Sequence, residues 1–239
     1  MRHSFLLPIP SPRTSAFACS IALAALLVTG CHSSHSTSLE SYSDSGQSFT
    51  GSSDGTLNVN KMGGDIHVLD APGGASLRTM GGSIIVDKAE KSLDITTMGG
   101  NVIVHSANVS SLKASSMGGN IDISATQASD LHADTAGGNI TVQTLADGSI
   151  NLKSLGGSIA LTIPRNSSTQ VDVELAYTMG SSQHYSVTSN LGLQQQQTSS
   201  WDLAHGNPRK YIYAKGTVGG GKNHIVIKTI DGNVTLNAQ

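Results

Sequence analysis

The chain has 239 residues, with 14 Lys and Arg against 16 Asp and Glu, and Phe, Trp and Tyr together make up only 4% of it. No basic run occurs anywhere in the sequence. A nucleic-acid-binding protein is therefore excluded, because it needs a basic surface and aromatic side chains on which bases stack.

Residues 1–30 have the features of a bacterial lipoprotein signal peptide. The start is positively charged and lacks acidic residues, and an apolar run of 13 residues follows at 16–28. That run has the length of a signal-peptide core and is shorter than the roughly 20 apolar residues of a transmembrane helix. Two small residues then precede Cys31, and a thiol is the group that lipoprotein processing acylates. We expect cleavage before Cys31 and a lipid on that cysteine, the alternative being an uncleaved membrane segment.

Processing at Cys31 would leave a mature chain without a free thiol. Cys19 would leave with the signal peptide, and stability would then come from packing and hydrogen bonds rather than from a disulfide. Residue 32 is His, whereas Asp at this place often retains lipoproteins at the inner membrane. We therefore expect a lipid-anchored protein of the cell envelope, at the outer membrane if the host has two membranes.

Residues 31–56 are predicted to form a flexible tether. The segment is rich in Ser, Thr, Gly and Asp and has few apolar residues, so it cannot bury enough surface to fold alone. As a random coil it would span roughly 25–30 Å.

A short motif, [MAL]-G-G-[DSN]-[IV]-x-[VIL], then repeats six times. Successive copies are 18, 18, 19, 19 and 19 residues apart, and such a short fixed period indicates stacked repeats. The first residues of the copies are Met62, Met80, Met98, Met117, Ala136 and Leu155.

Each repeat predicts two strands joined by a glycine turn. Apolar residues stand five and three positions before the first motif residue, and again four and six positions after it. This spacing of two is the signature of a strand with one buried face. The glycine pair lies between the strands, where we expect a positive φ.

A seventh copy occurs at the C-terminus, over 225–236, and its central residue follows that of the sixth copy by 75 residues. The predicted fold is therefore all-β: a single-stranded β-solenoid, similar to a parallel β-helix, with 18–19-residue coils over 57–239. An irregular β insertion at 164–224 interrupts it before the last coil, with strands expected at 169–177 and 211–214. A left-handed hexapeptide helix is excluded, because the apolar residues do not recur every six positions.

The column of first motif residues contains four methionines, whose thioethers could bind Cu(I). Because Ala136 and Leu155 complete the column, we expect it to form a packed corner of the core, where Met fills irregular gaps. No metal site is predicted there.

A polar column follows the glycines, and it consists of Asp65, Ser83, Asn101, Asn120, Asn139, Ser158 and Asn233. Calcium-binding β-rolls use G-G-x-G-x-D, but an apolar residue replaces the third glycine here and only Asp65 is charged among the six contiguous copies. We therefore expect a ladder of hydrogen bonds along the stack instead of calcium. The eight histidines after Cys31 lack the spacing of a helical zinc site, and we interpret them as solvated. No cofactor is predicted.

The outward positions offer one constellation that a polysaccharide-processing enzyme could use, since such sites need acids and bases on one face. Asp94, Lys113 and His132 would lie on successive coils, about 4.8 Å apart. Mixed polar residues on a solvated sheet usually serve solubility, so no catalytic residue is predicted. On the other strand, Ile85 and Ile103 would form a small outward apolar patch, which is a possible partner site.

The spaced GG-x-[IV]-x-[VIL] copies and the closing segment 218–236 resemble a widespread bacterial envelope family, the β-strand-repeat adhesin domain of unknown function. The resemblance covers 57–239 and is most specific in the closing segment. It implies a β-solenoid on the cell envelope, with adhesion proposed by analogy and with some members linked to envelope-stress regulation. It supplies no catalytic residues.

The sequence thus predicts a non-enzymatic, adhesin-like surface-interaction module. Its partners would be the membrane, through the lipid on Cys31, and an unknown protein or glycan ligand. One alternative is a periplasmic structural or envelope-stress-sensing component, and another is a polysaccharide-processing β-helix enzyme.

Overall fold

The computed structural model describes residues 37–40, 48–181, 184–204 and 206–239. The predicted signal peptide, Cys31 and much of the predicted tether lie outside the described residues. The described part is all-β, and it contains no helix long and apolar enough to cross a membrane.

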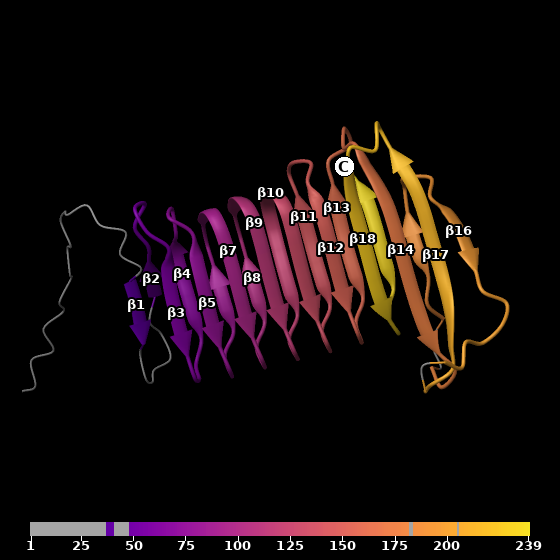
Figure 1. The fold of residues 1–239 in the computed structure, drawn as a ribbon, viewed down its shortest axis with the longest axis horizontal. Helices are drawn as coiled ribbons and strands as arrows, with labels where there is room; N and C mark the ends of the chain where they lie inside the picture. The colour runs from indigo at the N-terminus through magenta and orange to yellow at the C-terminus, as the bar shows by residue number, and fades with distance from the viewer. Residues whose placement is uncertain (1–36, 41–47, 182–183, 205) are drawn as a thin grey trace, which may run out of the picture. The chain divides into compact units, whose positions relative to one another are not determined.

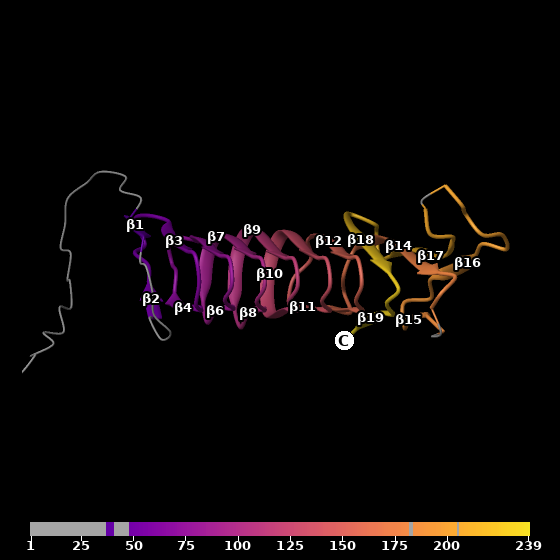
Figure 2. The same cartoon turned by 90° about the horizontal axis from the view of Figure 1, so that it is seen from below.

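The predicted β-solenoid is confirmed. Parallel strands stack coil upon coil in two layers, which Figure 2 shows edge-on and Figure 1 shows face-on. Strand positions repeat every 18 residues in the first coils and every 19 later, as in the pairs Leu57↔Ala75 and Leu112↔Leu131.

The first layer holds, in stacking order, β1 (Thr37–Glu40), β3 (Leu57–Lys61), β5 (Ala75–Thr79), β7 (Ala89–Thr97), β9 (Ala107–Ser116), the second part of β10 (Ile121–Thr135), β12 (Ser149–Ser154), β18 (Asn223–Ile230), β14 (Thr169–Thr178), β17 (Arg209–Val218) and β16 (Gln194–Gln197). The second layer holds β2 (Ser48–Thr50), β4 (Ile66–Asp70), β6 (Ile84–Val86), β8 (Val102–Val104), the first part of β10, β11 (Ile140–Thr144), β13 (Ile159–Ile163), β19 (Val234–Ala238) and β15 (Val187–Ser189). All pairings within these layers are parallel except those of β17 with β14 and with β16, which are antiparallel.

The core is a set of in-register apolar columns between the two layers. Ile66 pairs with Ile84, which pairs with Val102, and the column continues through the later coils. Every apolar position predicted at five and three residues before the motif and at four and six residues after it is buried. Strands β1 and β2 extend the stack into the range predicted as a tether, since they pair with β3 and β4, and Phe49 of β2 is buried in the core.

The corner beside the glycine turn differs from the prediction. The methionine column, with Ala136 and Leu155, points outward and is exposed, so the expected packed corner is wrong. The buried residue is the one before it, because the alternation of the first strand continues for one more step. This buried column consists of Lys61, Thr79, Thr97, Ser116, Thr135, Ser154 and Thr229.

The hydroxyls of this column bind each coil to its neighbour. Thr97 Oγ1 donates to the carbonyl of Gly82 in the preceding coil at 2.8 Å and accepts from the backbone N–H of Gly100 at 3.2 Å. Ser116 repeats both bonds, at 3.0 Å and 2.9 Å. In the first coil Lys61 occupies the position, and its Nζ donates to the carbonyl of Asp65 at 2.9 Å.

Replacing Thr97 by Val should destabilise the solenoid by about 2 kcal/mol, because an isosteric methyl leaves a buried carbonyl and a partly buried N–H without their partner. Urea denaturation followed by circular dichroism measures the change. Thr96→Val is the matched control, since Thr96 lies on the outward side of the same strand and should change stability by less than about 0.5 kcal/mol. Equal effects of the two substitutions would contradict a structural role for the buried hydroxyl.

The glycine turns of the repeat motif depend on glycine for a reason other than the predicted positive φ. Among the motif's glycine pairs only Gly64 has a positive φ, of 77°. The second glycine of each later pair instead lies against the backbone of the preceding coil: a Cβ on Gly100 would meet the carbonyl oxygen of Gly82 at 2.1 Å. The second glycine therefore recurs from coil to coil because the coils stack too closely there for a side chain.

The seventh copy does not end the stack. β18 pairs with β12 of the sixth coil on one side and with β14 of the insertion on the other, as Figure 1 shows. In the second layer β19 lies likewise between β13 and β15. The insertion therefore caps the stack, and the C-terminal coil lies inside it. The predicted strands at 169–177 and 211–214 correspond to β14 and β17.

Candidate functional site

The three outward residues considered as an enzyme site, Asp94, Lys113 and His132, are neighbours in the strand register, but the side chains of Asp94 and His132 are bonded elsewhere. Asp94 is the register partner of Lys113, which is the register partner of His132. Asp94, however, pairs with Arg78 at 3.6 Å, and His132 pairs with Asp134 at 3.2 Å. Both pairs are well exposed, so water screens them. The acid and the base are thus each bonded to a residue outside the trio.

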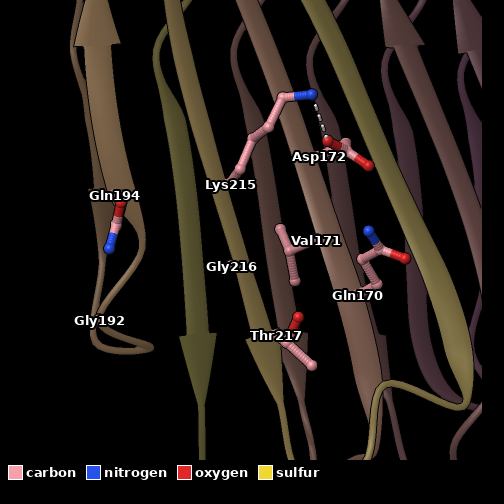
Figure 3. A pocket seen from close by; sticks show the side chains of 8 residues that line it. All are labelled: Gln170, Val171, Asp172, Gly192, Gln194, Lys215, Gly216 and Thr217. Carbon is pink, nitrogen blue, oxygen red and sulfur yellow. Dashed lines mark ion pairs between the residues drawn. The ribbon is translucent and has the colours of Figure 1, made fainter.

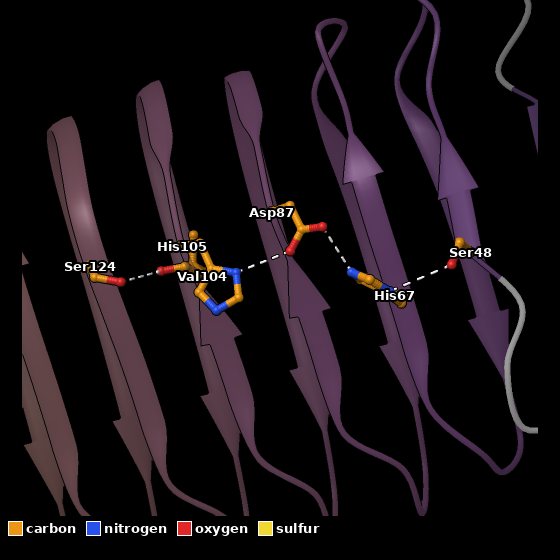
Figure 4. A network of polar contacts seen from close by, with 6 residues as sticks. All are labelled: Ser48, His67, Asp87, Val104, His105 and Ser124. Atoms are coloured by element: carbon orange, nitrogen blue, oxygen red, sulfur yellow. Dashed lines mark hydrogen bonds and ion pairs between the residues drawn. The ribbon is translucent and has the colours of Figure 1, made fainter.

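Two histidines interpreted as solvated take part in a polar network on the second layer (Figure 4). The carboxylate of Asp87 lies between them, 2.9 Å from His67 Nε2 and 3.0 Å from His105 Nδ1. Hydrogen bonds with His105 and then with His67 lower the pKa of Asp87. The network joins successive coils, and within the described chain no cluster of three or more His, Cys, Asp or Glu side chains could hold a metal ion.

The polar column after the glycines forms the expected ladder, with one difference in its partners. Each side-chain oxygen accepts a hydrogen bond from the backbone N–H of the next coil instead of from a neighbouring amide. Asn101 Oδ1 accepts from the N–H of Asn120, and Asn120 Oδ1 accepts from that of Asn139, both at 2.8 Å. The ladder fixes the turns and leaves these oxygens engaged.

The two residues of the predicted apolar patch lie side by side on the outward face of the second layer. Ile85 and Ile103 are register partners on β6 and β8, and both are half-buried on the outward side. The patch is small, because the same column continues as His67 on one side and Asp122 on the other.

A hollow of about 500 Å³ opens on the capping insertion, where β14 and β17 run antiparallel beside the loop that leads into β16 (Figure 3). Most of its lining is polar, and the lining residues are Gln170, Val171, Asp172, Gly192, Gln194, Lys215, Gly216 and Thr217. The alternation of β14 directs Gln170 and Asp172 outward, while Val171 is buried in the core.

Asp172 is the charged centre of this hollow. Its two carboxylate oxygens contact Lys215 Nζ at 3.0 Å and His224 Nε2 at 2.7 Å. These hydrogen bonds, that of His224 first, lower the pKa of Asp172, so the carboxyl is ionised at neutral pH. Next to it, Glu174 pairs with Lys228 at 3.0 Å. The hollow therefore presents fixed charges and side-chain amides rather than a free acid and base.

Aromatic side chains gather on the same insertion, which contains four of the five tyrosines and the only tryptophan of the chain. On the outward face of β17, Tyr211 and Tyr213 stack with ring centroids 5.8 Å apart and an interplanar angle of 11°. Burial and a hydrogen bond to Asp202 raise the pKa of Tyr211. Trp201 packs edge-on against Tyr177, and the ammonium of Lys210 lies 5.0 Å from its ring centre.

Sequence reasoning predicted strands in this insertion but missed the side-chain contacts that form the hollow. The outward residues of β14 could be read from its alternation, but their partners on β17 depend on an antiparallel pairing between segments about forty residues apart. Concentration of the aromatic residues in 164–224 was the available signal.

The fold defines the chain as a β-solenoid repeat protein with a capping insertion. It matches no known protein family, no curated protein and no solved structure. The resemblance to the envelope adhesin family stays a prediction.

Proposed function

We propose that this chain is a membrane-anchored, non-enzymatic surface-interaction module of adhesin type, which binds its ligand on the outward face of the capping insertion. The observation that carries the proposal is the hollow around Asp172, together with the stacked pair of Tyr211 and Tyr213 on the same outward face of β17 as Lys215. Concave sites with a few fixed polar groups are where proteins usually bind ligands.

The chemistry of the hollow favours a glycan over an apolar ligand. Carboxylate, ammonium and amide groups from Asp172, Lys215 and Gln194 offer both donors and acceptors to hydroxyl groups. Flat tyrosine faces add apolar contact area at a small cost in conformational entropy. Asp172 is already bonded to Lys215 and to His224, which suits binding better than proton transfer.

Binding of the fluorescently labelled chain to an oligosaccharide array tests the site. Tyr213→Ala and Asp172→Asn should each weaken binding about tenfold or more, as expected for residues at the centre of an interface. Lys153→Ala, on the outward side of β12, is the control and should bind as the unmodified chain does. Ile85→Asp tests the predicted apolar patch in the same assay.

Loss of binding in the Ile85 variant alone would move the ligand site from the cap to β6 and β8. Anchoring is tested separately, by metabolic fatty-acid labelling of the chain and of a Cys31→Ala variant, together with protease treatment of intact cells. Label lost in the variant and cleavage on intact cells support the anchored adhesin. Protection until the envelope is broken would overturn surface adhesion in favour of the periplasmic alternative.

A further inference from the structure

Four methionines form an exposed column on the first four coils. Their residues are between 46% and 70% exposed: Met62 70%, Met80 52%, Met98 46% and Met117 59%. Exposed apolar residues of this size usually occur singly on a protein surface, so four in line need an explanation.

The stacking keeps the column in register. Each methionine directly follows a residue of the buried column, and these residues pair in register from coil to coil, as Thr79 does with Thr97 and Thr97 with Ser116. The hydroxyls of Thr79, Thr97 and Ser116 are bonded inward, which fixes the next side chain outward. Successive methionine Cα atoms are therefore about 4.8 Å apart, the spacing of neighbouring strands.

We propose that Met62, Met80, Met98 and Met117 form a binding site for a soft monovalent cation, Cu(I) or its analogue Ag(I). Thioethers are ligands that select Cu(I). The methionine side chain is unbranched and has three rotatable bonds, so sulfur atoms from neighbouring coils can converge on one ion. Hard cations such as calcium and magnesium would not bind, since they need oxygen ligands.

The same position in the later coils argues for sulfur rather than for simple apolar contact. Ala136 and Leu155 occupy it in the fifth and sixth coils, and Leu155 is as exposed as the methionines. An aliphatic side chain is therefore accommodated there, and an apolar surface would not require methionine in four consecutive coils. This site lies on the coils, apart from the hollow on the cap, and the inference does not depend on the proposed function.

The test uses the full-length chain with Cys19→Ser and Cys31→Ser, so that no thiol competes for the metal. Methionine methyl groups are labelled with ¹³C, and silver nitrate is added in chloride-free buffer. One equivalent of Ag(I) should shift the methyl signals of the column and leave that of Met179 in place, because Met179 is equally exposed but lies outside the column. Calorimetric titration gives the affinity.

Met80→Leu/Met98→Leu removes the central thioethers and keeps the apolar surface, and Leu155 shows that leucine fits this position. This variant should retain its melting temperature and lose Ag(I) affinity by about tenfold or more, whereas Met179→Leu should bind as before. Unshifted column signals, an equal shift of Met179, or undiminished affinity in the double variant would each overturn the proposal. Competition with a Cu(I)-specific chelator under anaerobic conditions should give the same ranking of the variants. Equal Cu(I) affinity of the double variant and the unmodified chain would overturn the proposal for copper.

Discussion

Gly100→Ala is expected to destabilise the solenoid by about 4 kcal/mol or more. Only a few mechanisms change the free energy of unfolding this much, and a backbone clash in a packed interior is one of them. The added methyl carbon would lie 2.1 Å from the carbonyl oxygen of Gly82 and 2.3 Å from its carbon. Neither atom belongs to a flexible side chain, so relief requires that two coils move apart. Such movement would also break the hydrogen bond that Thr97 donates to the carbonyl of Gly82 in the preceding coil.

Gly99→Ala is the matched control, because the two residues are neighbours in the same turn. The nearest atoms to a Cβ on Gly99 are 3.8 Å away, which is ordinary van der Waals contact, and its φ lies outside the left-handed region. This substitution should change stability by less than about 0.5 kcal/mol. Urea denaturation monitored by far-ultraviolet circular dichroism compares the two. Similar midpoints would mean that the turns are looser than the stacking distances indicate.

The buried strand positions could be predicted from the sequence because pleating forces every second side chain to one face. Hydrophobicity alone could not show which residue is buried at the corner beside the glycine turn. Met98 is apolar and Thr97 is polar, which favours burying the methionine, but the alternation from Leu93 and Ile95 points to Thr97 as the next inward residue. Backbone carbonyls and amides at the turn need a buried partner, and a hydroxyl supplies one where a thioether cannot.

The charged centre of the cap could not be predicted, for a different reason. Asp172 looks like any outward residue of an alternating strand, and so does Lys215 on β17. Their contact arises only when β17 turns back antiparallel on β14 and closes the stack. Local periodicity carries no signal about which distant segments pair, so the pair becomes visible only in three dimensions.

The place of the seventh copy in the stack could not be predicted from the sequence either, since its apolar residues could pack on either side of the insertion. Its polar residues bind in both directions. Toward the sixth coil, Thr229 Oγ1 donates to the carbonyl of Gly157 at 2.6 Å. Toward the insertion, Asp231 accepts from the N–H and the hydroxyl of Thr178, both at 2.9 Å. The last coil is thus the connection between the solenoid and its cap.

Deleting residues 223–239 is therefore expected to unfold the cap, although every residue of the insertion remains in the chain. β14 would lose its parallel partner β18, and β15 would lose β19. What remains of the first layer in the cap, β14, β17 and β16, would have no apolar coil to cover, and so small a sheet without a packed face is marginal in water. The emission of Trp201, the only tryptophan, should shift to the wavelength of the unfolded chain, while circular dichroism still shows the strands of the earlier coils.

A point substitution separates this role from the effects of a shortened chain. Ile227 is fully buried between Leu152 and Val173, so Ile227→Asp should lower the stability of the cap by about 4 kcal/mol and shift the Trp201 emission in less urea. Lys228→Ala, on the outward side of the same strand, removes only an exposed ion pair with Glu174 and should change stability by less than about 1 kcal/mol. The competing outcome is that β14 docks directly onto β12, since Val171 and Val173 could fill the places of Ile225 and Ile227. In that case Trp201 would keep its native emission in the deleted chain, and the last coil would be a spacer rather than the connection on which the cap depends.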